Sequence, residues 1–156
     1  MRIVLDTNVL VSALLSPSGP PARILGLVMA GAIACCVDAR ILAEYDAVLH
    51  RPRLSIDAAR ADDVLEELRR SGLPVASVPL PRPLPDLDDE QFVEVGLAGG
   101  ARCLVTGNGA HYPDDRCLGL PVLSPAELIE VVRRLSGTGL SRGQPPSRLT
   151  PPPGRL

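Results

Sequence analysis

The sequence predicts an α/β fold in which a parallel sheet is flanked by helices. Short apolar runs alternate along the chain with longer segments of helical periodicity, which is typical of strands connected by helices. In addition, the first strand, residues 3–5, ends at a carboxylate, Asp6, and a helix pattern begins directly after it. Ligands bind at the carboxyl ends of strands in open sheets of this kind. Asp6 is therefore a candidate site residue, although it can also serve only as the cap of the next helix.

Turn and capping residues set the boundaries of the expected elements. Strands are expected at residues 3–5, 33–37, 75–78, 102–106 and 121–123. Helices are expected at residues 7–15, 21–30, 38–50, 57–71, 88–98 and 125–136. The third helix begins at the cap Asp38 and stops before Pro52, because the residue preceding a proline disfavours the helical region. Gly72 ends the fourth, and Ser124 with Glu127 forms a capping box for the last.

Two segments outside this alternation are rich in proline. Residues 79–85 carry four alternating prolines and are expected to form an extended surface link. Residues 137–156 contain five Pro, four Gly and three Arg without hydrophobic periodicity, and we expect a disordered tail. The expected organisation is thus one domain over residues 1–136 and a Pro/Gly/Arg tail over residues 137–156.

Composition excludes several function classes. All 16 basic residues are arginines, which excludes Schiff-base lysine chemistry and the phosphate-loop lysine. The net charge of −2 and the three aromatic residues do not favour a large basic surface or base stacking. The four cysteines form no CxxC pair, so small core residues in a reduced cytoplasm are expected rather than a zinc site. No apolar stretch of membrane-spanning length and no signal peptide are visible, so a cytoplasmic protein without a membrane partner is expected.

Two further acids face the expected core. On the helix at 38–50, Glu44 flanks the apolar stripe that contains Ile41 and Val48; it can be an edge acid paired with an arginine or a ligand of a cation. In the acidic run 86–90, only Asp89 shares the helical phase of the buried-type stripe, whereas Glu90 and Glu94 fall on the opposite face.

Gly96 lies on the stripe of Asp89, and we expect it to let this helix approach the sheet closely. Asp86 or Asp88 can then act as the helix cap. Three inward acids from separate elements predict a site for Mg2+ or Mn2+, which prefer oxygen ligands. Such a site can assist phosphodiester hydrolysis and makes the low positive charge of the chain compatible with a polyanionic substrate.

Several segments, in order and spacing, have counterparts in one known family. They are residues 3–12, 42–45, 51–54, 86–92, 99–108, 111–113 and 123–128. By these segments the chain resembles the PIN-domain ribonucleases, in particular the bacterial branch of toxins from toxin–antitoxin pairs related to the VapC toxins. The likeness covers about residues 1–134. It implies a Rossmann-like, three-layer fold whose parallel sheet has the strand order 3-2-1-4-5.

The resemblance also implies an activity and its residues. It implies a Mg2+- or Mn2+-dependent endoribonuclease that cleaves single-stranded or looped RNA and leaves a 5′-phosphate and a 3′-hydroxyl. Asp6, Glu44 and Asp89 match the acidic triad of the family. Many members carry a fourth acid where this chain has Asn108, a neutral oxygen ligand that would weaken one metal position. Alternatively, Asn108 only closes the loop after the fourth strand, in the left-handed conformation that asparagine tolerates.

Other polar residues receive supporting roles. Asn8 and Thr106 are expected to hydrogen-bond to the carboxylates and orient them. His111 can contact a phosphate or be an ordinary loop histidine. Three arginines are further candidates for phosphate contact: Arg23, Arg51 and Arg53. The alternative is that they are solvated charges at helix ends.

The expected partners are an RNA substrate, a cognate antitoxin protein and a second copy of the chain. The homodimer is expected because the helices at 21–30 and 57–71 carry apolar positions that one small sheet does not cover. Two other functions stay open. One is a catalytically weak RNA-binding or interaction module, which Asn108 favours; the other is a housekeeping RNA-processing nuclease.

Overall fold

The computed structural model describes residues 1–138, in which helices and strands alternate. Residues 139–156, most of the expected tail, lie outside the described residues. The strands are β1 (Arg2–Leu5), β2 (Ala34–Val37), β3 (Leu73–Pro74), β4 (Cys103–Val105) and β5 (Val122–Leu123). The α-helices are α1 (Thr7–Leu15), α2 (Pro20–Met29), α3 (Ala39–Leu49), α4 (Ala58–Ser71), α5 (Glu90–Ala98) and α6 (Pro125–Thr138). Short 3-10 turns are η1 (Pro52–Leu54), η2 (Leu87–Asp89) and η3 (Gly109–His111).

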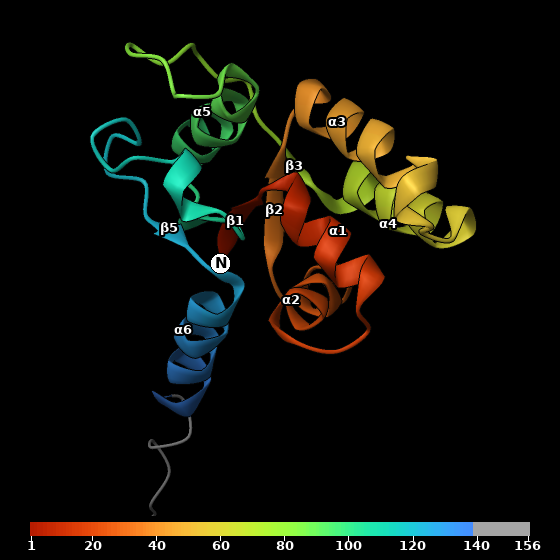
Figure 1. Ribbon diagram of the computed structural model, residues 1–156. Helices are drawn as coiled ribbons and strands as arrows, with labels where there is room; N and C mark the ends of the chain where they lie inside the picture. The colour runs from red at the N-terminus through yellow and green to blue at the C-terminus, as the bar shows by residue number, and fades with distance from the viewer. Residues whose placement is uncertain (139–156) are drawn as a thin grey trace, which may run out of the picture.

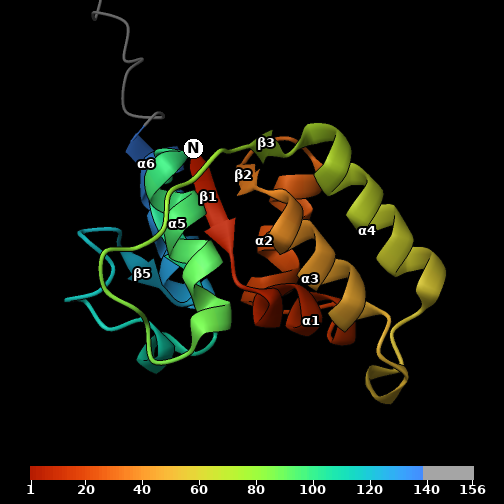
Figure 2. The ribbon, with the colours of Figure 1, turned by 90° about the horizontal axis from the view of Figure 1, so that it is seen from above.

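The five strands form one parallel sheet in the order β3-β2-β1-β4-β5, which confirms the predicted fold and strand order. The central strand β1 pairs with β2 on one side and β4 on the other. Helix α5 packs on one side of β1, whereas α1 to α4 lie on its other side (Figures 1 and 2). The side chains of β1 from Ile3 to Leu5 are fully buried between these layers.

Capping residues act where the sequence predicts them. The Asp38 carboxylate accepts the N–H of Ile41 over 2.9 Å at the start of α3. The Ser124 N–H donates to the Glu127 carboxylate over 2.7 Å, which forms the capping box of α6. This last helix continues through Thr138, two residues beyond the predicted end.

Helix α5 lies close to the sheet at Gly96. A Cβ atom at this position would lie 2.6 Å from Leu120 Cδ2 and 3.4 Å from Val4 Cγ2. The predicted close approach is therefore confirmed. All four cysteines are free and buried, as expected of small core residues.

Two predictions about the chain between α4 and α5 are wrong. The third strand lies at Leu73–Pro74 rather than at residues 75–78, because the chain pairs with β2 immediately after Gly72 and leaves the sheet after Val75. The proline-rich link is not wholly on the surface, since Leu84 is buried. In the described part of the chain, no helix combines the length and apolarity needed to cross a membrane.

A third prediction fails on α5. The helical phase predicts Glu94 on the face opposite the core stripe, but Glu94 is buried, with an exposed fraction of 5%. The proline-rich link covers this face of the helix, and Leu80 N–H donates to Glu94 Oε1 over 3.1 Å. Arg40 neutralises the same carboxylate at 2.8 Å, so the buried charge is paired.

Candidate active site

The predicted site residues meet at the carboxyl edge of the sheet. Asp6 follows β1 directly, and Thr106 follows β4, the neighbouring parallel strand. Because parallel strands end at the same edge, residues a hundred positions apart come into contact. The Thr106 hydroxyl donates to Asp6 Oδ2 over 2.8 Å.

Asp6 is a buried carboxylate held by hydrogen bonds. Its Oδ2 also accepts Asn8 Nδ2–H over 3.1 Å and the Tyr112 hydroxyl over 2.9 Å. Within residues 1–138, its Oδ1 accepts only the Asn8 N–H, at 3.5 Å, as the cap of α1. Among the described residues no arginine or histidine forms an ion pair with Asp6, so polar donors alone solvate this charge.

The direction of these hydrogen bonds is fixed by the surrounding groups. Asn8 Oδ1 accepts Gly107 N–H over 2.9 Å, which leaves the Asn8 amide nitrogen to face Asp6 and Thr106. Thr106 Oγ1 accepts Asn108 N–H over 3.0 Å, so its single proton is available for the carboxylate. The structure thus places Asn8 and Thr106 around Asp6 in an orienting arrangement.

Glu44 lies on α3 and is held from two other elements. Thr7 Oγ1, at the start of α1, donates to Oε1 over 2.6 Å, and Gln91 Nε2, on α5, donates to Oε2. Burial raises the pKa of Glu44 above its ordinary value; the charges of Asp6 and Asp88 raise it further, against the lowering effect of the two donors.

Asp89 closes the 3-10 turn η2 and begins α5. Burial and the negative charges of Asp6 and Asp86 raise the pKa of Asp89 to about 6, although His111 opposes this shift. His111 Nδ1 lies 3.0 Å from Asp89 Oδ2. A carboxylate that is destabilised in this way gains from a cation, which would offset the repulsion.

Asn108 is linked to Asp89 through His111. Its Nδ2 lies 2.8 Å from His111 Nε2, so the imidazole bridges Asn108 and Asp89. The backbone of Asn108 has φ −137°, so this residue does not adopt the left-handed conformation, and that part of the alternative prediction is wrong. Asn108 therefore adopts an ordinary conformation and directs its amide toward the partner of Asp89.

A cleft of about 530 Å³ lies beside these residues, between α1, the end of α3 and η2. Its lining includes both acids and arginines, among them Glu44 and Asp89 and also Arg51 and Arg53. Arg23, in contrast, is exposed on α2 and is not among the residues that line the cleft.

The chemistry of these side chains fits a hard divalent cation. Asp6, Glu44 and Asp89 offer carboxylate oxygens, and each is destabilised or solvated by neutral groups rather than by an arginine. Within residues 1–138 no three His, Cys, Asp or Glu side chains stand close enough to enclose one ion together. Mg2+ needs no such cage, because it commonly binds one or two carboxylates and keeps several waters.

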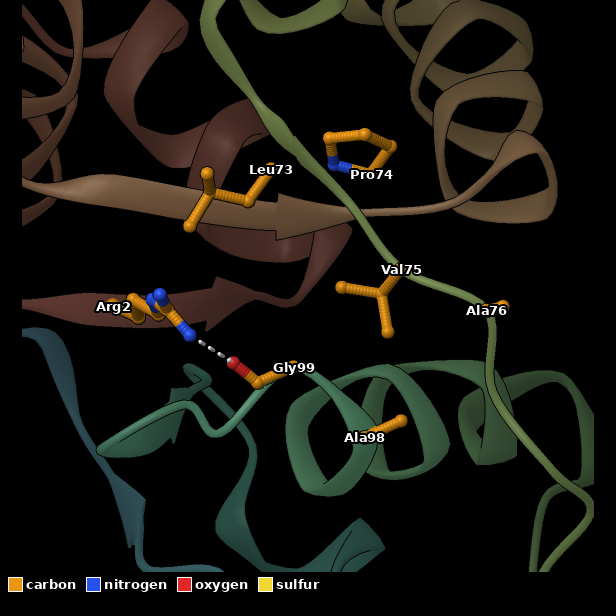
Figure 3. A pocket seen from close by; sticks show the side chains of 7 residues that line it. All are labelled: Arg2, Leu73, Pro74, Val75, Ala76, Ala98 and Gly99. Atoms are coloured by element: carbon orange, nitrogen blue, oxygen red, sulfur yellow. Dashed lines mark hydrogen bonds between the residues drawn. The ribbon is translucent and has the colours of Figure 1, made fainter.

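A second hollow lies at the opposite edge of the sheet and lacks this chemistry. Figure 3 shows it between the start of β1, β3 and the end of α5, lined by Arg2, Leu73, Pro74, Val75, Ala76, Ala98 and Gly99. Its one charged side chain, Arg2, donates to the Gly99 carbonyl over 3.2 Å. No carboxylate is among the residues that line this hollow.

Three donors to the acids were not singled out from the sequence. They are Thr7 and Gln91, which bind Glu44, and Tyr112, which binds Asp6. Thr7 could have been found by its place beside Asp6. Tyr112 and Gln91 act across 106 and 47 positions of the chain, and no local pattern signals such contacts.

Comparisons with known proteins agree with this architecture. A family model described as PIN domain matches residues 2–110. Comparison with curated proteins gives no match. Among solved structures, the chain is similar to one in the crystal structure of VapBC2 from Rickettsia felis bound to a DNA fragment from their promoter. The TM-score is 0.53 at 15% identity, over 80% of this chain and 98% of that chain, so this likeness concerns the fold.

Proposed function

The chain belongs to the PIN-domain family, and on this premise we propose that it is a Mg2+- or Mn2+-dependent endoribonuclease that acts as the toxin of a toxin–antitoxin pair. The observation that carries the proposal is that Asp6, Glu44 and Asp89 come together at the carboxyl edge of the sheet, beside a cleft that two arginines also line. The structural similarity to a VapBC2 chain supports the toxin assignment.

Asp6, Glu44 and Asp89 are the proposed carboxylate ligands, of which one or two would contact the cation directly and the rest through its bound waters. Asn108 is proposed near the position of a fourth ligand. A divalent cation held there supplies positive charge that stabilises an in-line phosphodiester displacement. Thr7 and Gln91 keep Glu44 in one orientation, and Thr106 with Asn8 does the same for Asp6.

Substrate would be held along the cleft. Arg51 and Arg53 line the same cleft as Glu44 and Asp89 and can contact phosphates on one side of the scissile bond. His111, which is 46% exposed, stands at the rim next to Asp89 and can donate to a phosphate oxygen once a cation occupies that carboxylate. RNA in single-stranded or looped form is the proposed substrate, as the resemblance to PIN-domain ribonucleases implies. No aromatic side chain lines the cleft, so the proposed contacts are to phosphates through charge.

A direct experiment is incubation of the purified chain with single-stranded RNA in Mn2+, in Mg2+ or in chelator. The proposal expects cleavage only with the metals and products with 5′-phosphate ends. Cleavage of equal rate in chelator would contradict it.

One observation favours a second candidate, a PIN-fold module that binds RNA with little cleavage. Asn108 is neutral where a fourth acid would add charge, and its amide is engaged with His111. In that case RNA would bind without being cut at any metal concentration. A housekeeping RNA-processing nuclease has the same chemistry, and an antitoxin gene beside this one would favour the toxin assignment. We further propose a homodimer and an antitoxin helix bound near the cleft.

A further inference from the structure

Tyr112 is the third donor to Asp6, and it lies beyond the stretch that the PIN-domain model matches. Its side chain is buried, with 2% exposed, and its Oη lies 2.9 Å from Asp6 Oδ2. An ionised carboxylate only accepts hydrogen bonds, so the phenol is the donor. Burial and the charges of Asp6 and Asp89 raise the pKa of Tyr112 well above its ordinary value, which keeps the hydroxyl protonated.

The donors leave the two oxygens of Asp6 unequal. Oδ2 accepts from Thr106, Asn8 and Tyr112 at 2.8, 3.1 and 2.9 Å. In the part of the chain that the structure describes, Oδ1 has one long contact, 3.5 Å from the Asn8 nitrogen. The protein thus occupies one oxygen fully and leaves the lone pairs of the other for a ligand.

Tyr112 differs from the other two donors in what it connects. Asn8 and Thr106 follow the adjacent strands β1 and β4, whereas Tyr112 follows η3, the turn that carries His111. His111 in turn contacts Asp89. The Tyr112 hydroxyl therefore links the position of η3, and with it the surroundings of Asp89, to Asp6.

We propose that Tyr112 is a positioning residue of this site. Its hydroxyl keeps Asp6 Oδ2 occupied, so that Oδ1 is the oxygen presented to a divalent cation, and it holds η3 beside Asp89. This inference rests on the proposed function, because it concerns how Asp6 is presented to the cation.

The test is Mn2+ binding by isothermal titration to Tyr112→Phe, with Tyr45→Phe as a matched control. Tyr45 is also buried, but its hydroxyl donates to the Leu5 backbone carbonyl over 2.5 Å rather than to a carboxylate. Each variant loses one buried hydroxyl and keeps its ring. Tyr112→Phe should raise the Kd for Mn2+ about tenfold, as is typical for loss of a group that orients a metal ligand, and Tyr45→Phe should bind like wild type.

Thermal unfolding in chelator separates a structural cost from the proposed role. Both variants should lose stability without metal, but only Tyr112→Phe should show a smaller rise of Tm when Mn2+ is added. Equal Mn2+ affinity of Tyr112→Phe and wild type would overturn the inference, as would equal weakening in both variants. Absence of Mn2+ binding by wild type would contradict the proposed function, and the inference with it.

A measurement on the unaltered protein covers the case in which Tyr112→Phe does not fold. In η3, the His111 and Tyr112 N–H groups donate to Asn108 and Gly109 carbonyls at 3.2 and 3.0 Å. If Tyr112 links this turn to Asp6, Mn2+ should slow hydrogen exchange of these two amides. Unchanged exchange with Mn2+ bound would overturn the inference.

Discussion

His111 Nδ1 lies 3.0 Å from Asp89 Oδ2, and this contact places an imidazole beside the carboxylate whose ionisation the fold opposes most clearly. The two residues belong to different connections of the sheet, η3 and η2. Burial and neighbouring acids raise the pKa of Asp89 to about 6 despite this partner. The contact therefore does not remove the repulsion among the acids, and a cation would.

The stability of the metal-free protein should consequently depend on pH through Asp89. A carboxyl group with a raised pKa binds more protons in the folded state than in the unfolded state, so the free energy of unfolding should fall as the pH rises from about 4 to above 6. Glu44, whose pKa is also raised, adds to the same trend.

Asp89→Asn should remove most of this decline and make the metal-free protein more stable than wild type at neutral pH. Thermal unfolding in chelator at acidic and neutral pH measures this difference in stability. Asp88→Asn, a change at an exposed position, is the control. A lower Tm for Asp89→Asn than for wild type at neutral pH would contradict the predicted repulsion.

The two substitutions should also differ in their effect on RNA cleavage, where Asp89→Asn should be the damaging one. Asp89 is half-buried next to Asp6, whereas Asp88 is exposed at the edge of the cleft. Cleavage of RNA should fall strongly in Asp89→Asn and much less in Asp88→Asn or Glu90→Gln. If Asp88→Asn proved the most damaging, the assignment of the third acid would be off by one position.

The helical phase of a sequence can select acids, but it does not reveal what covers them. Asp89 shares the helical phase of Phe92 and Val93, both of which are buried, and this phase predicts that it faces inward. The same reasoning placed Glu94 in solvent and failed, because the proline-rich link packs over that face and supplies Leu80 N–H as a donor. A link without periodicity gives no sign of where it will lie.

Long-range contacts also limit what the sequence can predict about the donors that hydrogen-bond to the site acids. The strand order brings β1 beside β4, so the meeting of Asp6 and Thr106 follows once the fold is known. A lone tyrosine such as Tyr112 instead has the pattern of an ordinary core residue. Its hydroxyl contact across 106 positions depends on how the segment after η3 folds back.

Asn108 offers a separate test of the metal position. If it occupies a ligand position, Asn108→Asp adds one negative charge beside Asp89 and should tighten Mn2+ binding and lower the metal concentration for half-maximal cleavage. Isothermal titration of Mn2+ into wild type and variant measures it. Identical titration curves would show that Asn108 only shapes the loop, and Asn108→Gly would then be harmless.

The arginines of the cleft should govern the salt dependence of RNA binding. Loss of one phosphate contact lowers the slope of log K against log salt by about 0.7 for a single strand. Arg51→Gln and Arg53→Gln should each weaken binding with such a change of slope. Arg23→Gln, outside the cleft, should leave both affinity and slope unchanged. Equal effects of all three substitutions on RNA affinity would contradict binding of RNA along this cleft.

The most direct test of the metal-dependent nuclease is the cleavage rate of Asp6→Asn. This change removes one negative charge and keeps the shape of a buried side chain held by Thr106 and Tyr112. With Mn2+ and single-stranded RNA, the rate should fall more than about 100-fold, or ~3 kcal/mol of activation free energy, while circular dichroism shows an intact fold. Cleavage by Asp6→Asn at a rate near that of wild type would contradict the proposed site and the function built on it.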